Sequence, residues 1–123
     1  MKHAIFLLAA LAMATSASRA EVVDIHWDGG GRFVHSGQIA VGKFVEVCGK
    51  LPVGLKVQWE FATRSPVDFN VHYHEGKAKV YAANLVAQTH ARELLEVRSE
   101  QDYCWTWTNK TRSRTWLRVT LQR

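Results

Sequence analysis

Lys56-Val57-Gln58-Trp59-Glu60-Phe61 alternates polar with apolar side chains at every position, and the stretch Val67–His74 repeats that period. The same alternation returns in Tyr103–Thr108 and in Leu117–Gln122. Because successive side chains of a strand point to opposite faces, this period predicts strands with one buried face. We expect the inward-facing side chains to form the core: Val57, Trp59, Phe61, Phe69, Val71, Tyr73, Trp105, Trp107, Val119 and Leu121.

Shorter apolar stretches and turn signals divide the rest of the chain. The further candidate strands are Val22–Trp27, Gln38–Cys48, Ala78–Ala82 and Leu94–Arg98, and Ala82–Leu95 could instead form a short helix. Turns are expected at Gly29–Gly31, Gly49–Gly54, Ser65-Pro66, Glu75-Gly76 and Asn109-Lys110, because glycine, proline and asparagine supply the backbone angles that end strands. Short strands at such regular spacing indicate a sandwich or a barrel. We predict an all-β fold, an antiparallel β-sandwich of the jelly-roll type with about 7 to 8 strands.

The first 20 residues have the three parts of an export signal. Lys2 gives a positive start, Ala4–Ala14 is an apolar run, and Ser18-Arg19-Ala20 places small residues before a cleavage site at Glu21. The alternative, an N-terminal membrane anchor, needs a longer run of roughly 20 apolar residues. We therefore predict a signal peptide at residues 1–20 and a single soluble domain at residues 21–123, exported to the periplasm or secreted, without a membrane span.

The charge balance is mildly basic. The chain carries 16 Lys and Arg against 11 Asp and Glu, a formal net charge of +5. Without Lys2 and Arg19, the predicted mature domain keeps 14 basic residues and a net charge of +3. Much of this excess lies near the C-terminus, at Lys110, Arg112, Arg114, Arg118 and Arg123. A basic surface favours anionic partners, although so small an excess is also ordinary solubility charge.

Two cysteines, Cys48 and Cys104, lie in the predicted mature domain. An exported chain meets an oxidising compartment, where an even cysteine count predicts a disulfide, and two buried thiols are the alternative. The spacing fits no CxxC metal or redox motif. Closing a loop of about 57 residues would stabilise the fold by about 4 kcal/mol through the entropy of the unfolded chain.

The order of several short motifs resembles a known domain. Cys48–Gly54 (CGKLPVG) leads into a strand, Asp68–Val71 lies in the next one, and Tyr103–Asn109 (YCWTWTN) comes before the final strand. From Val45 to the C-terminus this order resembles the GOLD (Golgi dynamics) domain, a β-sandwich of secretory-pathway cargo receptors and of some lipid-transfer proteins. The resemblance implies a sandwich, a general binding role and a disulfide between Cys48 and Cys104. The receptors have their second cysteine where this chain has Thr106, and their coiled coil and membrane anchor have no counterpart here, so the cargo function is not carried over.

His72-Tyr73-His74-Glu75 is the clearest candidate for chemistry. On a strand, His72 and His74 project from one face about 7 Å apart. Neutral imidazoles so placed can share a Zn²⁺ or Cu²⁺ ion when a third ligand joins them. The alternative is a pair of solvated histidines on the polar face of a half-buried strand. The candidate metal ligands are His72, His74, His90 and Asp68, with His35 and His26 as further possible sources, and no other cofactor is predicted.

Trp116 is the second candidate, because it shares a strand face with Arg118 and Thr120 rather than with the core residues. The other tryptophans at strand spacing are expected in the core. A tryptophan beside arginines can stack on nucleic-acid bases, but export argues against a nucleic-acid partner. The candidate interaction residues are therefore Trp116, Arg112 and Arg114, for a protein or small-molecule ligand that the sequence does not identify.

Motifs for catalysis are missing from the sequence: it has no Gly-x-Ser-x-Gly elbow, no phosphate-binding loop and no HExxH pattern. We assign no catalytic residue and predict a non-enzymatic binding module, with a periplasmic copper or zinc protein as the alternative and an enzyme as the third hypothesis. Asn109-Lys110-Thr111 fits an N-glycosylation acceptor, which matters only in a eukaryotic host. The short, alanine-rich signal favours a bacterial one.

Overall fold

The computed structural model describes residues 20–123, which fold into seven strands. The predicted signal peptide at residues 1–20 lies, apart from Ala20, outside the described residues. The strands are β1 (Glu21–Asp24), β2 (Arg32–Ile39), β3 (Phe44–Leu51), β4 (Lys56–Glu75), β5 (Ala78–Glu96), β6 (Gln101–Thr108) and β7 (Thr115–Gln122). They form one curled sheet in the order β1-β3-β6-β4-β7-β2, with β5 paired to β4 off this path.

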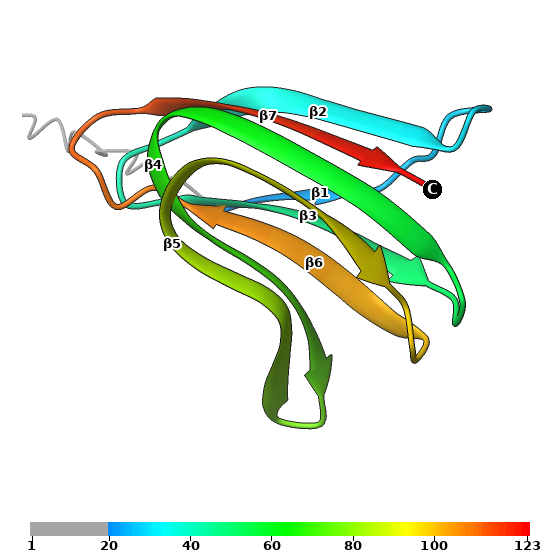
Figure 1. Ribbon diagram of the computed structural model, residues 1–123. Helices are drawn as coiled ribbons and strands as arrows, with labels where there is room; N and C mark the ends of the chain where they lie inside the picture. The colour runs from blue at the N-terminus through cyan, green and yellow to red at the C-terminus, as the bar shows by residue number, and fades with distance from the viewer. Residues whose placement is uncertain (1–19) are drawn as a thin grey trace, which may run out of the picture.

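Strand β4 builds the two layers of the sandwich (Figure 1). Its first part pairs with β7 from Gln58 to Thr63, and its second part pairs with β6 from Asp68 to His72. One layer therefore contains β2, β7 and the start of β4, and the other contains β1, β3, β6 and the end of β4. The all-β sandwich is confirmed. The sheet is mixed, however, because β1 runs parallel to β3 while the other pairs are antiparallel.

The turn expected at Ser65-Pro66 is wrong, because β4 continues through both residues. Proline has no backbone N–H to give to a ladder. Here Pro66 falls where the pairing with β5 is interrupted, between Ala62 and Val67. The strand bends at this gap and passes from one layer to the other without a turn (Figure 1).

The short helix considered at Ala82–Leu95 is also wrong, since this stretch is part of the 19-residue strand β5. Most side chains of β5 are exposed, so its sequence lacks a clean period of two. Strand β5 pairs with β4 along nearly its whole length, and this pairing overrides the helical preference of the local sequence. A positive φ of 54° at Ala87 lies close to the register shift between Val67 and Phe69 of β4, whose partners are Gln88 and Leu85.

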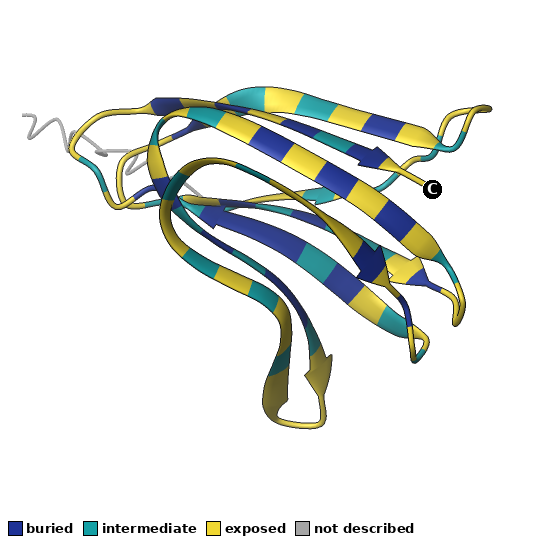
Figure 2. Ribbon diagram, in the orientation of Figure 1, coloured by how far each residue is buried: buried dark blue, intermediate teal, exposed yellow. Residues whose placement is uncertain are grey.

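The core lies between the two layers, as the alternation of buried and exposed positions along β4 and β7 shows (Figure 2). Nine of the ten residues expected to point inward are buried. The tenth, Tyr73, is partly buried and packs edge-on against Tyr103, with ring centroids 5.1 Å apart. Phe61 and Phe69 pack against each other between the layers, with ring centroids 4.6 Å apart. The ring centroid of Phe69 lies 5.4 Å from that of Trp107. Full burial of each such ring stabilises the fold by about 1.5–3 kcal/mol.

The predicted disulfide is confirmed between Cys48 and Cys104, which face each other across β3 and β6. Both cysteines are only partly buried, on the outer side of their layer. Among residues 20–123, no helix has the length and apolar character needed to cross a bilayer.

Candidate functional site

Trp116 stands on the outer face of the layer formed by β2, β7 and β4, with 48% of its surface exposed. Across β2 its partner is Gln38. On the other side Ala62 pairs with Arg118, and the amide of Ser65 donates to Thr115 Oγ1 at 2.9 Å. The β4–β7 register ends at the pair Thr63–Leu117, and extending it by one position would put Arg64 opposite Trp116. The alternation of β7 therefore places Trp116 as the sequence predicts.

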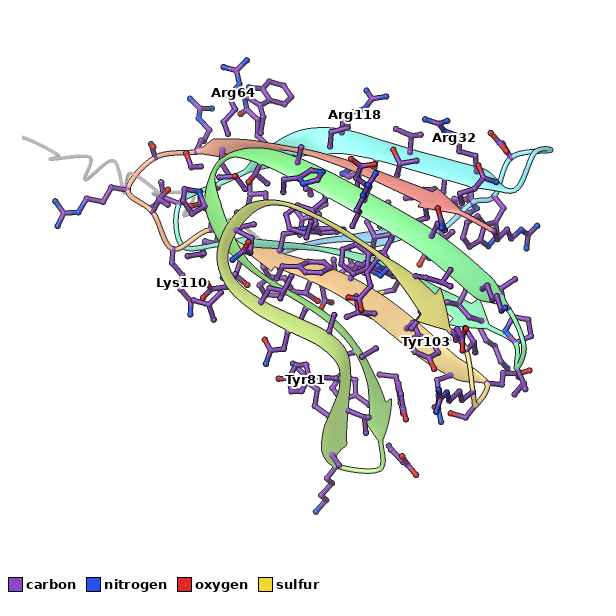
Figure 3. The ribbon with its side chains drawn as sticks, in the orientation of Figure 1. Arg32, Arg64, Tyr81, Tyr103, Lys110 and Arg118 are labelled. Atoms are coloured by element: carbon purple, nitrogen blue, oxygen red, sulfur yellow. A yellow bond between two sulfur atoms is a disulfide. The ribbon has the colours of Figure 1, made fainter. Side chains whose placement is uncertain are left out.

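Three exposed arginines lie on the same side as this tryptophan, Arg114 and Arg118 two positions before and after it in the chain and Arg64 on β4, and we call Arg64, Arg114, Trp116 and Arg118 the arginine face. Arg64 and Arg118 project from the same side of the molecule, as does Arg32 on β2 (Figure 3). Arg114 Nη1 donates to Gln38 Oε1 at 3.4 Å. The ion pairs within the described part of the chain involve histidines and lysines but none of these arginines. The face therefore carries uncompensated positive charge around an exposed aromatic ring.

A shallow hollow of about 490 Å³ continues the outer face of the same layer. Its polar lining comes from Gln58, Glu60, Arg92, Glu93, Thr120 and Gln122. The Glu60 carboxylate binds His90 Nε2 at 2.9 Å, and this hydrogen bond is the main reason that the pKa of Glu60 is lowered. The hollow is thus a polar extension of the surface that carries Trp116.

The loop between β6 and β7 is fixed by Asn109, which is fully buried. Its Nδ2 donates to the carbonyls of Ile39 and Ser113 at 3.0 and 2.8 Å. Its Oδ1 accepts from the amide and the hydroxyl of Thr111 at 3.0 and 2.7 Å. The glycosylation acceptor suggested by Asn109-Lys110-Thr111 is therefore wrong for the folded chain, because both N–H groups of this amide are buried and bonded. The same loop presents the exposed residues Arg112 and Arg114.

A polar row crosses the outer face of the other layer. Cys48 pairs with Cys104, Cys104 pairs with His72, and His72 pairs with Tyr81. Two residues before Cys48 on β3, Glu46 pairs with Thr106 of β6. The Thr106 hydroxyl donates to Glu46 Oε1 at 2.9 Å. Side chains from β3, β6, β4 and β5 therefore lie side by side on this face.

His72 is buried in this row, with 1% of its surface exposed. The alternative of a solvated histidine at this position is therefore wrong, whereas His74 is exposed. His72 Nδ1 lies 2.6 Å from Asn70 Oδ1, and His72 Nε2 lies 3.9 Å from Glu46 Oε1. Burial is the main cause of a lowered pKa at His72, and Lys79 adds to it.

The predicted metal ligands do not all come together. The rings of His72 and His74 are 5.2 Å apart. His90 bonds to Glu60, and Asp68 accepts from Lys110 Nζ at 2.7 Å and from the amide of Ala87 at 3.0 Å. The lysine bond is the main reason that the pKa of Asp68 is lowered. Of the further histidines, His35 faces Glu21 at 3.9 Å, and His26 is exposed in the segment after β1.

The structure instead brings Glu46, His72 and Cys104 together, with one possible ligand atom of each within 4.8 Å of the others. Glu46 could not be identified from the sequence, because its neighbour in space, His72 on β4, lies 26 positions further along the chain. A correct pairing of β3, β6 and β4 would have been needed to find it.

Solved structures share this fold at low sequence identity. The PliG protein of Aeromonas hydrophila, a periplasmic inhibitor of g-type lysozyme, aligns with a TM-score of 0.63 and 10% identity over 85% of this chain and 96% of its own. The pre-peptidase C-terminal domain of a Bacillus anthracis collagenase aligns at 0.63 with 9% identity, over 85% of this chain and 97% of its own. The PliG of Salmonella Typhimurium, also a periplasmic inhibitor of g-type lysozyme, aligns with a TM-score of 0.56 and 13% identity over 85% of this chain and 98% of its own. At these identities the similarity establishes the fold.

Comparison by sequence finds no protein-family model and no curated protein that matches. The resemblance to the GOLD domain therefore stays a prediction.

Proposed function

We propose that this chain is an exported, non-catalytic binding module, and that its partner is a protein with an acidic surface that docks on the arginine face. The disulfide and the predicted signal peptide support export, because disulfides persist in oxidising compartments. Among the proteins of the same fold are periplasmic inhibitors, whose function is to bind another protein, a g-type lysozyme. A similar role for this chain requires a surface that can recognise a partner.

The observation that carries the proposal is an exposed tryptophan among arginines that form no ion pair. Tryptophan and arginine are enriched among the residues that dominate protein interfaces. Like charges close together repel one another, so carboxylates of a partner would relieve that repulsion as well as form new bonds. The interface should therefore weaken as salt concentration rises.

The test is affinity capture from the extracytoplasmic fraction of the source cells, with the captured proteins identified by mass spectrometry. The test variant is the double substitution Trp116→Ala/Arg118→Glu. The matched control is Tyr81→Ala/Lys77→Glu, which removes an aromatic side chain of the same 48% exposure and reverses one charge on the β4–β5 hairpin.

A single acidic protein should be captured in stoichiometric amount by the wild type and by the control, released by salt, and lost from the test variant. Equal capture by both variants would exclude the arginine face as the docking surface. Capture of no protein would contradict the binding function. A purified g-type lysozyme is the first defined probe. If it is the partner, the chain slows its lysis of bacterial cell walls, and the test variant does not.

A further inference from the structure

The Cys48–Cys104 disulfide lies in a cluster of metal-binding side chains, and this cluster is independent of the arginine face. Cys48, Cys104 and His72 occupy one row across β3, β6 and β4, and Glu46 lies next to that row. Each side chain projects from the same outer face, because the alternate positions Val47, Trp105 and Val71 are buried in the core.

The hydrogen bonds prepare His72 to act as a ligand. Its Nδ1 lies 2.6 Å from the amide oxygen of Asn70, an acceptor, so Nδ1 carries the proton and donates it. The Nε2 lone pair then faces Glu46 Oε1 at 3.9 Å. His72 Nε2 and Glu46 Oε1 are then two neighbouring acceptor atoms without a proton between them. A cation bound to both would stabilise this arrangement. Histidine ligands of metals commonly donate their other N–H group to an oxygen in this way, because the bond fixes the orientation of the ring.

We propose that reduction of the Cys48–Cys104 disulfide converts this cluster into a zinc site whose ligands are Cys48, Cys104, His72 and Glu46. Two thiolates, one imidazole and one carboxylate form a ligand set that Zn²⁺ accepts in tetrahedral geometry. A dithiol reductant cleaves the sulfur–sulfur bond and becomes a disulfide itself, so two electrons and two protons pass to the two sulfur atoms. Zinc then displaces both thiol protons to solvent.

The sheet keeps the four ligands together after reduction. The Cα atoms of Cys48 and Cys104 are 4.2 Å apart and lie in the continuous ladder between β3 and β6. His72 is held opposite Cys104 by the ladder between β4 and β6. Since backbone hydrogen bonds rather than the sulfur–sulfur bond set these positions, small side-chain rotations are enough to converge on one ion. Zinc would replace the covalent link between β3 and β6 and extend it to β4.

When the disulfide is intact, His72 and Glu46 are the members of this cluster that remain as strong ligands. We therefore expect zinc binding to tighten on reduction by a factor on the order of a hundred or more, because two thiolates join a two-ligand pair. The stoichiometry in the reduced chain should be a single ion per molecule.

The experiment uses the full mature chain without a histidine tag, reduced with a phosphine that is removed before titration under argon. Zinc binding is measured by competition with a chromophoric chelator, and Co²⁺ serves as a spectroscopic probe of thiolate and tetrahedral coordination. Near-ultraviolet circular dichroism, which reports the packing of the buried tryptophans, shows whether the reduced chain remains folded.

The test variant is Glu46→Gln, which keeps an oxygen that can accept the Thr106 bond but removes the charged ligand. The matched control is Glu60→Gln, because Glu60 and His90 form a histidine–carboxylate pair on the other layer without a cysteine nearby. A third variant, Cys48→Ser/Cys104→Ser, removes both thiolates.

The proposal predicts tight zinc binding and a thiolate–cobalt absorption band in the reduced wild type and in Glu60→Gln. It predicts an affinity at least about tenfold lower in Glu46→Gln, and no such band in the double cysteine variant. Equal zinc affinity of the oxidised and reduced chains would overturn it. A normal affinity in Glu46→Gln would overturn the proposed ligand set, and so would a reduced chain that loses its folded circular dichroism signal with zinc present.

Discussion

Replacement of Asn109 by alanine should be among the most damaging single substitutions of a polar residue in this protein. The side chain is fully buried and makes four hydrogen bonds, two as donor and two as acceptor. Each bond contributes about 0.5–1.5 kcal/mol net, and a buried group left without a partner costs about 1–3 kcal/mol. The carbonyl of Ile39 is such a group. We therefore expect Asn109→Ala to lower the free energy of unfolding by about 3 kcal/mol.

Two related variants make the reasoning specific. Asn109→Asp keeps the shape of the side chain but places a carboxylate oxygen against the carbonyls of Ile39 and Ser113, so at neutral pH it should destabilise the fold at least as much as alanine. Its folded-state pKa would be raised, so part of the loss should be recovered as the pH falls and the carboxyl group becomes a donor. Thr111→Val removes one hydroxyl that is only partly buried, and should cost about 1 kcal/mol or less.

The assay is equilibrium unfolding in urea, followed by the fluorescence of the buried tryptophans, with the slope of the transition checked for constancy. A loss of less than about 1 kcal/mol for Asn109→Ala would refute the reasoning, because it would mean that water satisfies the freed groups at no cost. A normal stability of Asn109→Asp at neutral pH would refute the orientation of the amide, in which Nδ2 faces the carbonyls of Ile39 and Ser113.

Three further predictions follow from single features of the fold. The double variant Cys48→Ala/Cys104→Ala should lose about 4 kcal/mol in urea unfolding, because the disulfide closes a loop with a sequence separation of 56; an unchanged midpoint would contradict this. Burial lowers the folded-state pKa of His72, so the unfolded chain binds more protons, and stability should fall as the pH drops below about 6.5, by at most about 1.4 kcal/mol per pH unit. His72→Gln should flatten that slope between pH 7 and 5. Trp116→Ala should change stability by less than about 0.5 kcal/mol while weakening partner binding, since the side chain is half exposed.

The sequence allowed the core to be predicted because its strongest pattern has a physical cause. Phe61 and Trp107 are buried at positions set by the period of two, which depends only on the local geometry of a strand. The path of the chain could not be predicted in this way. Pro66 is usually a sign of a turn, and only the pairing partners of β4 show that it occupies an interruption in a ladder. Strand β5 is an edge strand with mostly exposed side chains, so its pattern carries little information.

The candidate surfaces also contain some residues that could be predicted from the sequence and others that could not. Trp116 was found from the sequence because alternation within one strand places it opposite to the core side. Arg64 was not found, because its position beside Trp116 depends on the register between β4 and β7, which are about 50 residues apart. Glu46 was missed for the same reason. Local periodicity predicts which face a residue occupies, whereas the neighbours on that face come from long-range pairing.

The two candidate surfaces depend on one structural feature, the passage of β4 from one layer to the other. Before the bend its outward side chains, Glu60 and Arg64 among them, belong to the layer that carries Trp116. After the bend His72 belongs to the layer that carries the disulfide. Because a sandwich buries only the inner face of each layer, a strand that serves both layers leaves outward positions on two separate surfaces. A domain of this size can therefore dedicate one face to a partner and the other to the cross-link that holds β3 and β6 together, without either requirement disturbing the shared core.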